Sequence, residues 1–468
     1  MRMNLRRGNS RNIYELEKLP TYKMLLRIAA PVMLSLFVQA LYTLVDGIYV
    51  SRIDEAAISA VSLAFIVQSV EVALFTGIAA GINAMVSKEL GAERRASARD
   101  ATLNGCAIQV AVAVAFMLFG VFGTAFYFRK STVDALVIHY GISYLRPCLL
   151  AALITGFQIT YERFLNAVGM TTYVLISHIV GSLVNIILDP ILIFGVGFIP
   201  SMGITGAAYA TIIGQFFSFG ILFYFNHRKN HILFDKTRRH FDFNQILQIC
   251  KIGLPTSFMG IATSIGNYAI NRVVLSFSTT ALAAYGIYLK VQSVLNMPPQ
   301  GIGVALVTMF SFFYGKKSMP RIRETVKWGM IFLGGYGLFC TLLLNIFPLT
   351  ILGLFETSPQ LREIAVVAFR IIGLTYFPSA PFHCYTSFFQ STERSHLSLC
   401  FIVSRQFLAR IPMAILLSTF GRVNLIWWCY PISEIVSDSI TIIVFIWALK
   451  KTEEGIRKSL NPIYTGVQ

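Results

Sequence analysis

The first half of this chain is repeated in its second half at a constant offset of 224 residues (255 − 31), the offset that relates Pro31 to Pro255. At this offset Val67–Val70, which reads Val-Gln-Ser-Val, recurs unchanged at 291–294. Further matches pair Gly77 with Gly301, Gly91 with Gly315 and Arg146 with Arg370. A duplicated apolar chain predicts two related halves with a pathway between them, an arrangement typical of transporters.

Composition places both halves in a membrane. Hydrophobic residues make up 55% of the chain and charged residues 13%, with a mean hydropathy of +0.66. A soluble domain this apolar would expose large adhesive patches. Twelve stretches are long enough to cross about 30 Å of hydrocarbon as helices. They lie near 28–50, 57–84, 101–127, 135–159, 172–198, 204–226, 246–275, 281–310, 328–352, 361–388, 397–419 and 424–449. We therefore expect an all-α polytopic membrane protein of twelve transmembrane helices in two six-helix repeats.

The distribution of the net charge of +17 predicts the orientation of the chain. Lys and Arg concentrate in the N-terminal tail and in the even-numbered connections, as at Lys88, Arg94 and Lys316, whereas the odd-numbered connections hold few. The positive-inside rule then places both termini in the cytoplasm, at the cell membrane. Attraction to anionic headgroups accounts for the charge, so we expect the lipid bilayer, and no nucleic acid, as a partner.

The longest polar connection divides the chain. We expect an N-terminal lobe at 1–226 with helices 1–6 and a basic cytoplasmic tail, a cytoplasmic linker at 227–245, and a C-terminal lobe at 246–468 with helices 7–12 and a cytoplasmic tail. Six helices before the linker return the chain to its starting side, so the repeats have parallel topology. Segments 22–27 and 245–251 predict amphipathic entry segments at the cytoplasmic interface. We expect a monomer.

Acidic residues inside the predicted helices mark the candidate site, because a charge at the bilayer centre costs roughly 2.5–3.5 kcal/mol on insertion scales. Asp46 follows Tyr42 by one turn, so the two share a helical face. Asp189 follows Asn185 by one turn and precedes Pro190, which frees a backbone carbonyl for a cation or a water. Burial favours the neutral form of a carboxylic acid, and a second carboxylate favours it further. Asp46 and Asp189 therefore predict a site that takes up and releases a proton or cation; alternatively, Asp46 only accepts a hydrogen bond from a neighbouring helix.

Other charges inside helices favour structural roles. Glu71 is expected to pair with a lysine or to reach the interface, rather than to act directly. In the second half Glu434 and Asp438 lie one turn apart on one face. Basic residues of second-half helices are Arg272, Lys290, Arg405 and Arg410. This balance predicts a second-lobe charge network of buried ion pairs, in which Lys290 could instead carry a protonation signal.

Nothing in the chain predicts an enzyme. His178 and His383 have no catalytic partners at useful spacing, and we expect them to be packed or hydrogen-bonded. The seven cysteines show no metal-ligand spacing. We expect no metal and no cofactor apart from a coupling ion.

Three motifs in order resemble the multidrug and toxic compound extrusion (MATE) antiporters, in particular their DinF-like branch. These motifs are Leu41–Asp46 after Pro31, Asn185–Phe194, and Gly203–Thr211. The resemblance spans essentially all twelve helices. It implies a secondary exporter of amphipathic, often cationic organic compounds, driven by inflow of H⁺ or Na⁺.

The resemblance also implies particular residues. It maps the cation site onto Tyr42, Asp46, Asn185, Asp189 and Thr211. It makes Pro31 the point at which helix 1 bends on protonation, and Pro255 is its counterpart in the repeat. Another branch uses acids in helices 7 and 10. This chain has Ser257 and Phe377–Pro381 there, so a second-lobe cation site of that kind is not expected.

The substrate pathway should lie between the lobes, which we expect to rock in alternating access. An adaptable apolar cavity would use Met and aromatic surfaces, for which Met259, Met297 and Phe382 are candidates. The alternative is a flippase for lipid-linked sugars, which would need Arg or Lys clustered on first-lobe helices. Those helices carry little basic charge beyond Arg146, which favours the exporter of small organic molecules.

Overall fold

The computed structural model describes residues 12–197, 199–235, 239–355 and 358–460, and these are almost entirely helical. The first half contains α1 (Ile13–Leu16), α2 (Thr21–Ser51), α3 (Glu55–Gly91), α4 (Arg95–Leu118), the π-helix η1 (Phe119–Gly123), α5 (Thr124–Ser131), α6 (Ala135–Leu150), α7 (Ala152–Ala167), α8 (Thr171–Phe194) and α9 (Ile204–Lys229). The second half contains α10 (Phe243–Leu275), α11 (Thr279–Leu295), α12 (Met297–Gly315), α13 (Met319–Ile346), α14 (Pro348–Leu352), α15 (Pro359–Gly373), α16 (Tyr376–Ser391), α17 (Ser395–Val403), the π-helix η2 (Ser404–Arg410), α18 (Ile411–Ser418), α19 (Val423–Ile426) and α20 (Cys429–Leu460). Most of the predicted basic tail, the end of the C-terminal tail and linker residues 236–238 lie outside the described residues.

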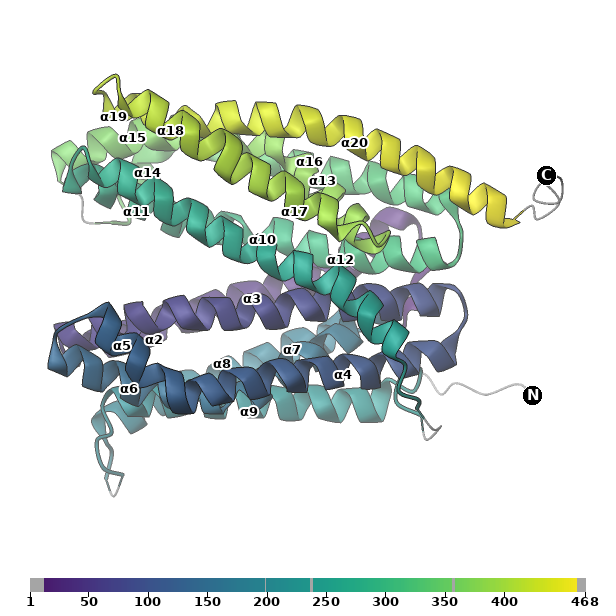
Figure 1. Ribbon diagram of the computed structural model, residues 1–468, viewed down its shortest axis with the longest axis horizontal. Coiled ribbons are helices and arrows are strands. Elements are labelled where there is room, and N and C mark those ends of the chain that lie inside the picture. The colour runs from purple at the N-terminus through teal and green to yellow at the C-terminus, as the bar shows by residue number, and fades with distance from the viewer. Residues whose placement is uncertain (1–11, 198, 236–238, 356–357, 461–468) are drawn as a thin grey trace.

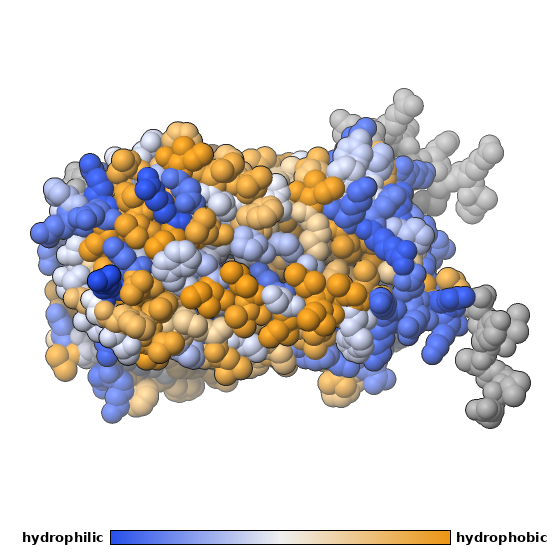
Figure 2. All heavy atoms as spheres, turned by 90° about the horizontal axis from the view of Figure 1, so that it is seen from above, coloured by the Kyte–Doolittle hydropathy of each residue, from blue (hydrophilic) through white to orange (hydrophobic). Residues whose placement is uncertain are grey.

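The helices match the predicted membrane spans. Among the described residues, nine helical runs are long and apolar enough to cross a membrane, and two bent helix pairs raise this to eleven. The remaining predicted span, 281–310, is divided between α11 and α12 at Asn296. Figure 2 shows a broad apolar band on one face of the molecule, bounded by hydrophilic residues at both ends. The predicted all-α membrane architecture is therefore confirmed.

The duplication extends to bends in the helices. α6 meets α7 at an angle of 49°, and α15 meets α16 at 50°. Ala151 at the first bend and Thr375 at the second are related by the 224-residue offset. The same offset relates two turns with left-handed backbone, at Glu93 (φ 60°) and Lys317 (φ 57°). The two halves therefore share backbone detail as well as sequence.

The helices form two bundles that lie side by side: a first lobe of α2–α9 and a second lobe of α10–α20 (Figure 1). We call the end of the molecule where α2 begins and α20 ends the proximal end, and the opposite end the distal end. The ribbons of the two lobes lie close together towards the proximal end and diverge towards the distal end. Asn83 of α3 illustrates the contact, since its Nδ2 donates to Thr308 Oγ1 of α12 at 3.1 Å.

Glycines bring the two lobes into backbone contact at the proximal end. A Cβ atom on Gly91 would lie 1.9 Å from the carbonyl oxygen of Phe312, and one on Gly315 would lie 1.9 Å from that of Lys88. The offset of 224 converts the first contact into the second, because it carries Gly91 to Gly315 and Lys88 to Phe312. Such reciprocal contacts are those expected across a pseudo-two-fold axis between the lobes.

A second reciprocal pair lies nearer the middle of the molecule. A Cβ on Gly77 would meet the backbone nitrogen of Ser257 at 2.4 Å, and one on Gly301 would meet that of Met33 at 2.9 Å. The offset again relates the two contacts. The four contacts together form a seam along α3, α10, α12 and α2.

The short helix α1 fills the proximal end of this seam. Ile13 and Leu16 are buried, and the Tyr14 hydroxyl donates to the Leu90 carbonyl at 3.1 Å. The second lobe holds the same segment, because Arg321 Nη2 donates to the Glu17 carbonyl at 2.8 Å and Nη1 donates to Thr21 Oγ1 at 2.8 Å. The N-terminal segment thus joins both lobes.

The predicted interfacial entry segments are not separate elements. Residues 22–27 and 245–251 are the first turns of α2 and α10 and continue directly into the spans. At the start of α10 the reason is a buried polar contact, since Asn104 Nδ2 of α4 donates to Gln245 Oε1 at 2.6 Å. The linker before it lies against α4 as well, where Asp100 accepts from the His240 backbone N–H at 2.7 Å.

We expect the substitution Gly91→Ala to destabilise the protein, because the added methyl group collides with the Phe312 carbonyl. Overpacking of this kind costs about 1–3 kcal/mol, so the thermal unfolding midpoint in detergent should fall. Gly220→Ala in α9 is the control, because a Cβ there meets nothing within 4 Å. An equal response of the two variants would show that the seam does not require backbone contact at this position.

Candidate ion-binding site

Close packing of α8 against α9 positions the first-lobe acids. A Cβ on Gly214 would lie 2.8 Å from the Gly181 carbonyl oxygen and 3.1 Å from the Asn185 Cβ, so α9 lies directly against the face of α8 that carries Asn185. Towards the distal end, a Cβ on Gly206 would lie 2.4 Å from the Leu192 carbonyl oxygen. Asp189 lies between these two contacts and is 0% exposed.

The polar atoms of this site are only partly satisfied. Asn185 Nδ2 donates to Asp189 Oδ1 at 3.4 Å, a long hydrogen bond. Asp189 Oδ2, Asn185 Oδ1 and Asp46 Oδ1 are buried and have no hydrogen-bond partner. Asp46 comes from α2, and its carboxylate lies within electrostatic range of that of Asp189. Two helices therefore bring together oxygen atoms with up to two negative charges, a set that suits a proton or a hard monovalent cation.

The structure brings four of the five predicted residues into one cluster. Tyr42 is within electrostatic range of both Asp46 and Asp189. Thr211 of α9 is half-buried and lies between Gly206 and Gly214, at the level of Asp189. In the described chain no hydrogen bond joins Thr211 to the other four residues.

Pro31 and Pro255, the predicted hinges, both lie inside continuous α-helices, α2 and α10. Each proline removes one backbone donor from its helix. Each also lies close to a seam contact, at Met33 and at Ser257 respectively. Movement at either proline would therefore act on the contact between the lobes.

Glu71 corrects an expectation. It is 4% exposed, its Oε1 has no partner, and no ion pair to it occurs among the described residues. The reason is its buried location at mid-helix in α3, within electrostatic range of Cys148 of α6. Tyr144 of α6 is also buried within electrostatic range of Asp46. These two residues extend the polar cluster beyond the predicted set.

A second acid was missed because helix 4 is longer than predicted. α7 continues to Ala167 and carries Glu162, which the predicted span 135–159 left outside. Glu162 Oε2 lies 3.3 Å from His178 Nε2, and Asn166 Nδ2 donates to Glu162 Oε1 at 3.2 Å. His178 therefore has a hydrogen-bonding partner within the first lobe, near its proximal end.

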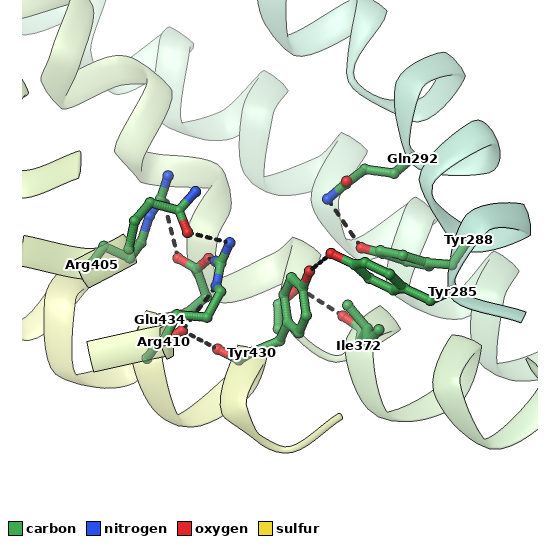
Figure 3. Close-up of polar contacts among 11 residues, drawn as sticks. Tyr285, Tyr288, Gln292, Ile372, Arg405, Arg410, Tyr430 and Glu434 are labelled. Carbon is green, nitrogen blue, oxygen red and sulfur yellow. Dashed lines mark hydrogen bonds and ion pairs between the residues drawn. The ribbon is translucent and has the colours of Figure 1, made fainter. Parts of the chain in front are cut away.

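The second lobe contains a compact ion-pair network (Figure 3). Glu434 Oε2 accepts from Arg405 Nη1 at 2.9 Å, and Glu434 Oε1 accepts from Arg410 Nη2 at 2.5 Å. Both arginines belong to η2, whose i→i+5 winding places residues five apart on nearly the same face. The Arg410 guanidinium also lies 4.3 Å from the ring centre of Tyr430, whose hydroxyl hydrogen-bonds to that of Tyr285.

The predicted composition of this network needs two changes. Lys290 makes no ion pair within the described chain, because it lies on the exposed face of α11. Asp438 is 7% exposed, one turn after Glu434, and neither of its carboxylate oxygens has a hydrogen-bond partner.

The candidate cavity residues lie in different surroundings. Phe382 is buried, and its ring centre lies 4.2 Å from the Arg405 guanidinium. Met297 is buried at the start of α12. Met259 is half-buried and packs against the main hydrophobic core. Phe382 therefore packs against the ion-pair network, and a cavity role for the three residues stays a prediction.

Comparison with known proteins matches the profile of one family, described as MatE, to residues 31–191 and 255–416. The probable multidrug resistance protein YoeA of Bacillus subtilis is 26% identical, over 87% of this chain and 89% of its own length. The probable multidrug resistance protein NorM of Thermotoga maritima is 23% identical, over 93% and 94%. A protein of Shewanella oneidensis named FAD transporter is 22% identical, over 89% and 92%.

Solved structures show the same fold. The crystal structure of a MATE protein in the bent conformation superimposes with a TM-score of 0.88 at 20% identity, covering 95% of this chain and 98% of the other. The outward-facing conformation of a multidrug resistance MATE family transporter superimposes with a TM-score of 0.87 at 21% identity, covering 94% and 98%.

We expect Arg410→Met to destabilise the second lobe strongly. The substitution leaves Glu434 buried with one partner fewer, and breaking a buried pair costs about 3–5 kcal/mol. Adding Glu434→Gln should recover part of this loss, because it removes the unpaired charge. Thermal unfolding in detergent measures both effects.

Arg323→Met serves as the control. Its pair with Glu453 is exposed, and such pairs contribute about 0–1 kcal/mol. Two results would contradict a stabilising buried network. One is an equal loss of thermal stability in Arg410→Met and Arg323→Met, and the other is a further loss when Glu434→Gln is added to Arg410→Met.

Proposed function

The chain belongs to the MatE family of membrane transporters, which are not enzymes, and on this basis we propose that it is a cation-coupled antiporter. It exchanges inflowing H⁺ or Na⁺ for small organic compounds that are amphipathic and cationic. The observation that carries the proposal is the set of buried, unpartnered oxygens on Asp46, Asn185 and Asp189.

Ion binding at this site has a direct physical consequence. With both carboxylates ionised, Asp46 and Asp189 repel each other in a low-dielectric interior. A proton or cation removes this repulsion, so α2 can settle differently against α8. Because α2 also carries Pro31 and the seam contact at Met33, a change in its packing reaches the contact between the lobes.

Alternating access then requires the seam to open and close. In the structure the lobes are joined at the proximal end and diverge at the distal end (Figure 1). The proximal end is strongly basic: a cavity of about 830 Å³ there is lined by Lys88, Arg94, Lys316, Lys317, Arg394 and Lys451, among others. By the positive-inside rule we take this as the cytoplasmic end, which puts both termini in the cytoplasm and the joined part of the seam on the cytoplasmic side.

The driving force depends on stoichiometry. One charge that crosses 100 mV contributes about 2.3 kcal/mol, and one pH unit contributes about 1.4 kcal/mol. Exchange of one proton for one monovalent cation moves no net charge and uses only the pH gradient. Two protons per substrate would also use the membrane potential.

The substrate class rests on the relatives and on charge. Two relatives are named multidrug resistance proteins, and an acidic first-lobe site suits cationic compounds. The flippase alternative requires basic side chains in the first lobe, where the buried charges are mainly acidic. The pathway lies between two lobes of one chain, so we propose a functional monomer in the cell membrane, without a cofactor other than the coupling ion.

We expect Asp46→Asn and Asp189→Asn each to reduce gradient-driven efflux of a cationic dye to the level of empty vesicles. Both substitutions remove the charge that the coupling ion neutralises while they preserve side-chain size. The assay uses reconstituted protein with pH and Na⁺ gradients imposed separately, which identifies the ion.

The matched control is Glu55→Gln, an exposed acid in the first turn of α3, which should keep full efflux. Efflux that persists in both aspartate variants would remove the site assignment. Scrambling of a polyprenyl-linked sugar by the purified protein, with no movement of dye, would favour the flippase.

We expect Arg321→Ala to favour opening at the proximal end. The substitution removes three hydrogen bonds from the second lobe to the N-terminal segment, at Glu17, Leu19 and Thr21. Hydrogen bonds from charged groups are worth about 1.5–3 kcal/mol each. A cysteine placed at Thr308, buried in the seam, should then react faster with a maleimide, in a variant that lacks the native cysteines. Arg323→Ala is the control, because its partner Glu453 lies in the same lobe. An unchanged labelling rate in Arg321→Ala would show that the contact of Arg321 with the N-terminal segment does not hold the lobes together.

A further inference from the structure

We propose that Asp438 is a second proton-binding site of the transport cycle, located in the second lobe and separate from Asp46 and Asp189. The inference rests on the proposed function in one respect, since binding at Asp438 drives transport only if the protein is a coupled antiporter. Proton binding itself can be tested without any substrate.

The carboxyl group of Asp438 is buried without a partner. Its side chain lies on α20, the residue is 7% exposed, and neither Oδ1 nor Oδ2 has a hydrogen bond. An isolated ionised carboxylate is very costly in such a place, and the ordinary remedies are a proton or a counter-charge in direct contact. The groups around Asp438 show whether a proton or a counter-charge neutralises it.

Charged and titratable groups approach Asp438 from three elements. Glu434 lies one turn earlier on α20, and Arg405 and Arg410 of η2 are within electrostatic range. From α16, Tyr385 is within electrostatic range of Asp438, and His383 lies within range of Arg405 and Glu434. With both acids ionised, the two arginines and two acids sum to zero, and a proton on Asp438 makes the cluster positive.

Neither arginine nevertheless makes a direct hydrogen bond to Asp438. Arg410 uses Nη2 for Glu434, Nη1 for Gln406 at 3.0 Å and Nε for Ser433 at 3.4 Å. Arg405 uses Nη1 for the other oxygen of Glu434 and stacks on the ring of Phe382, while its buried Nε has no partner. Glu434 therefore receives the direct hydrogen bonds, and Asp438 receives none.

A proton fits this site better than a metal cation. Hard cations require a shell of several oxygen ligands. Besides the two oxygens of Asp438, the adjacent Ser437 contributes one buried, unpartnered oxygen, and the nearby guanidinium groups repel any cation. A proton needs only one carboxyl oxygen and adds no volume.

A site in each lobe has a consequence for coupling. Two protons that enter in exchange for one monovalent organic cation move one net charge inward, so the membrane potential as well as the pH gradient drives export. The duplicated fold would thus use unrelated residues for the same task in its two halves, since Asp189 corresponds to Met413 at the 224-residue offset.

The test counts protons. Purified wild-type protein in detergent is shifted from acid to alkaline pH in weak buffer with an indicator dye, and the protons released per protein are measured. We expect Asp438→Asn to release one proton fewer than the wild type, with loss of the infrared carbonyl band of one protonated carboxyl group. Asp438→Glu retains the acid and should restore the proton. Ser439→Ala, an exposed position on the same helix, is the matched control and should release the wild-type number.

The outcomes separate this inference from the proposed function. An unchanged proton count and an unchanged band in Asp438→Asn overturn the second site, whatever the behaviour of the double variant Asp46→Asn with Asp189→Asn. If Asp438→Asn does not elute as a folded protein, the decision rests on the infrared band of Asp438→Glu, whose position must differ from that of the wild type. Protons released by added Na⁺ in the wild type but not in Asp438→Asn would overturn the assignment to a proton. A further outcome is the release of one proton fewer by Asp438→Asn together with dye efflux that does not respond to any imposed gradient. It would support the proton site at Asp438 and contradict the antiporter function.

Discussion

The structure depends on backbone contact between the lobes across a pseudo-two-fold axis. Where Gly91 faces Phe312 and Gly315 faces Lys88, helices of different lobes touch without intervening side chains. Small residues are the usual means by which helices pack closely in a membrane, where no hydrophobic force acts between helices. This contact sets the position of each lobe and leaves the distal parts of the lobes apart. A rocking movement of the lobes must either break the contacts of this seam or tilt the lobes about it.

Hydrogen bonds between the lobes supplement the backbone contact of the seam. The Asn83–Thr308 hydrogen bond lies inside it, and Arg321 joins α1 and the start of α2 to the second lobe. Hydrogen bonds buried in a low dielectric are strong but exchange readily for water when a gap opens. The combination of exchangeable polar contacts with a rigid backbone contact is suited to two alternative arrangements of whole lobes.

The two lobes share one fold, but their buried charged residues differ in whether they have partners. In the first lobe the oxygens of Asp46, Asn185 and Asp189 lack partners, so the site can respond to an ion. In the second lobe Arg405 and Arg410 hold Glu434, which makes that carboxylate a structural element. Asp438 is the exception within the second lobe. The duplication thus preserved backbone geometry, while the chemistry of each half diverged.

The sequence alone determined the helical membrane fold, and it predicted the two-lobe division and the acids of the first-lobe site. Hydropathy predicts spans because every backbone polar group in a bilayer must be satisfied within its own helix. The spacing of four residues places Tyr42 and Asp46 on one face of their helix, and Asn185 and Asp189 on one face of theirs. Only the tertiary structure decided which charges meet. Lys290 and Arg405 are equally plausible partners for Glu434 by sequence, yet the π-helical winding of η2 turns Arg405 towards it while α11 leaves Lys290 exposed. Glu162 was missed because it lies beyond the predicted end of its helix. Whether Glu71 and Asp438 have hydrogen-bond partners depends on residues that are distant in the sequence. Side-chain pairing depends on helix rotation and register between distant segments, and no local pattern encodes these.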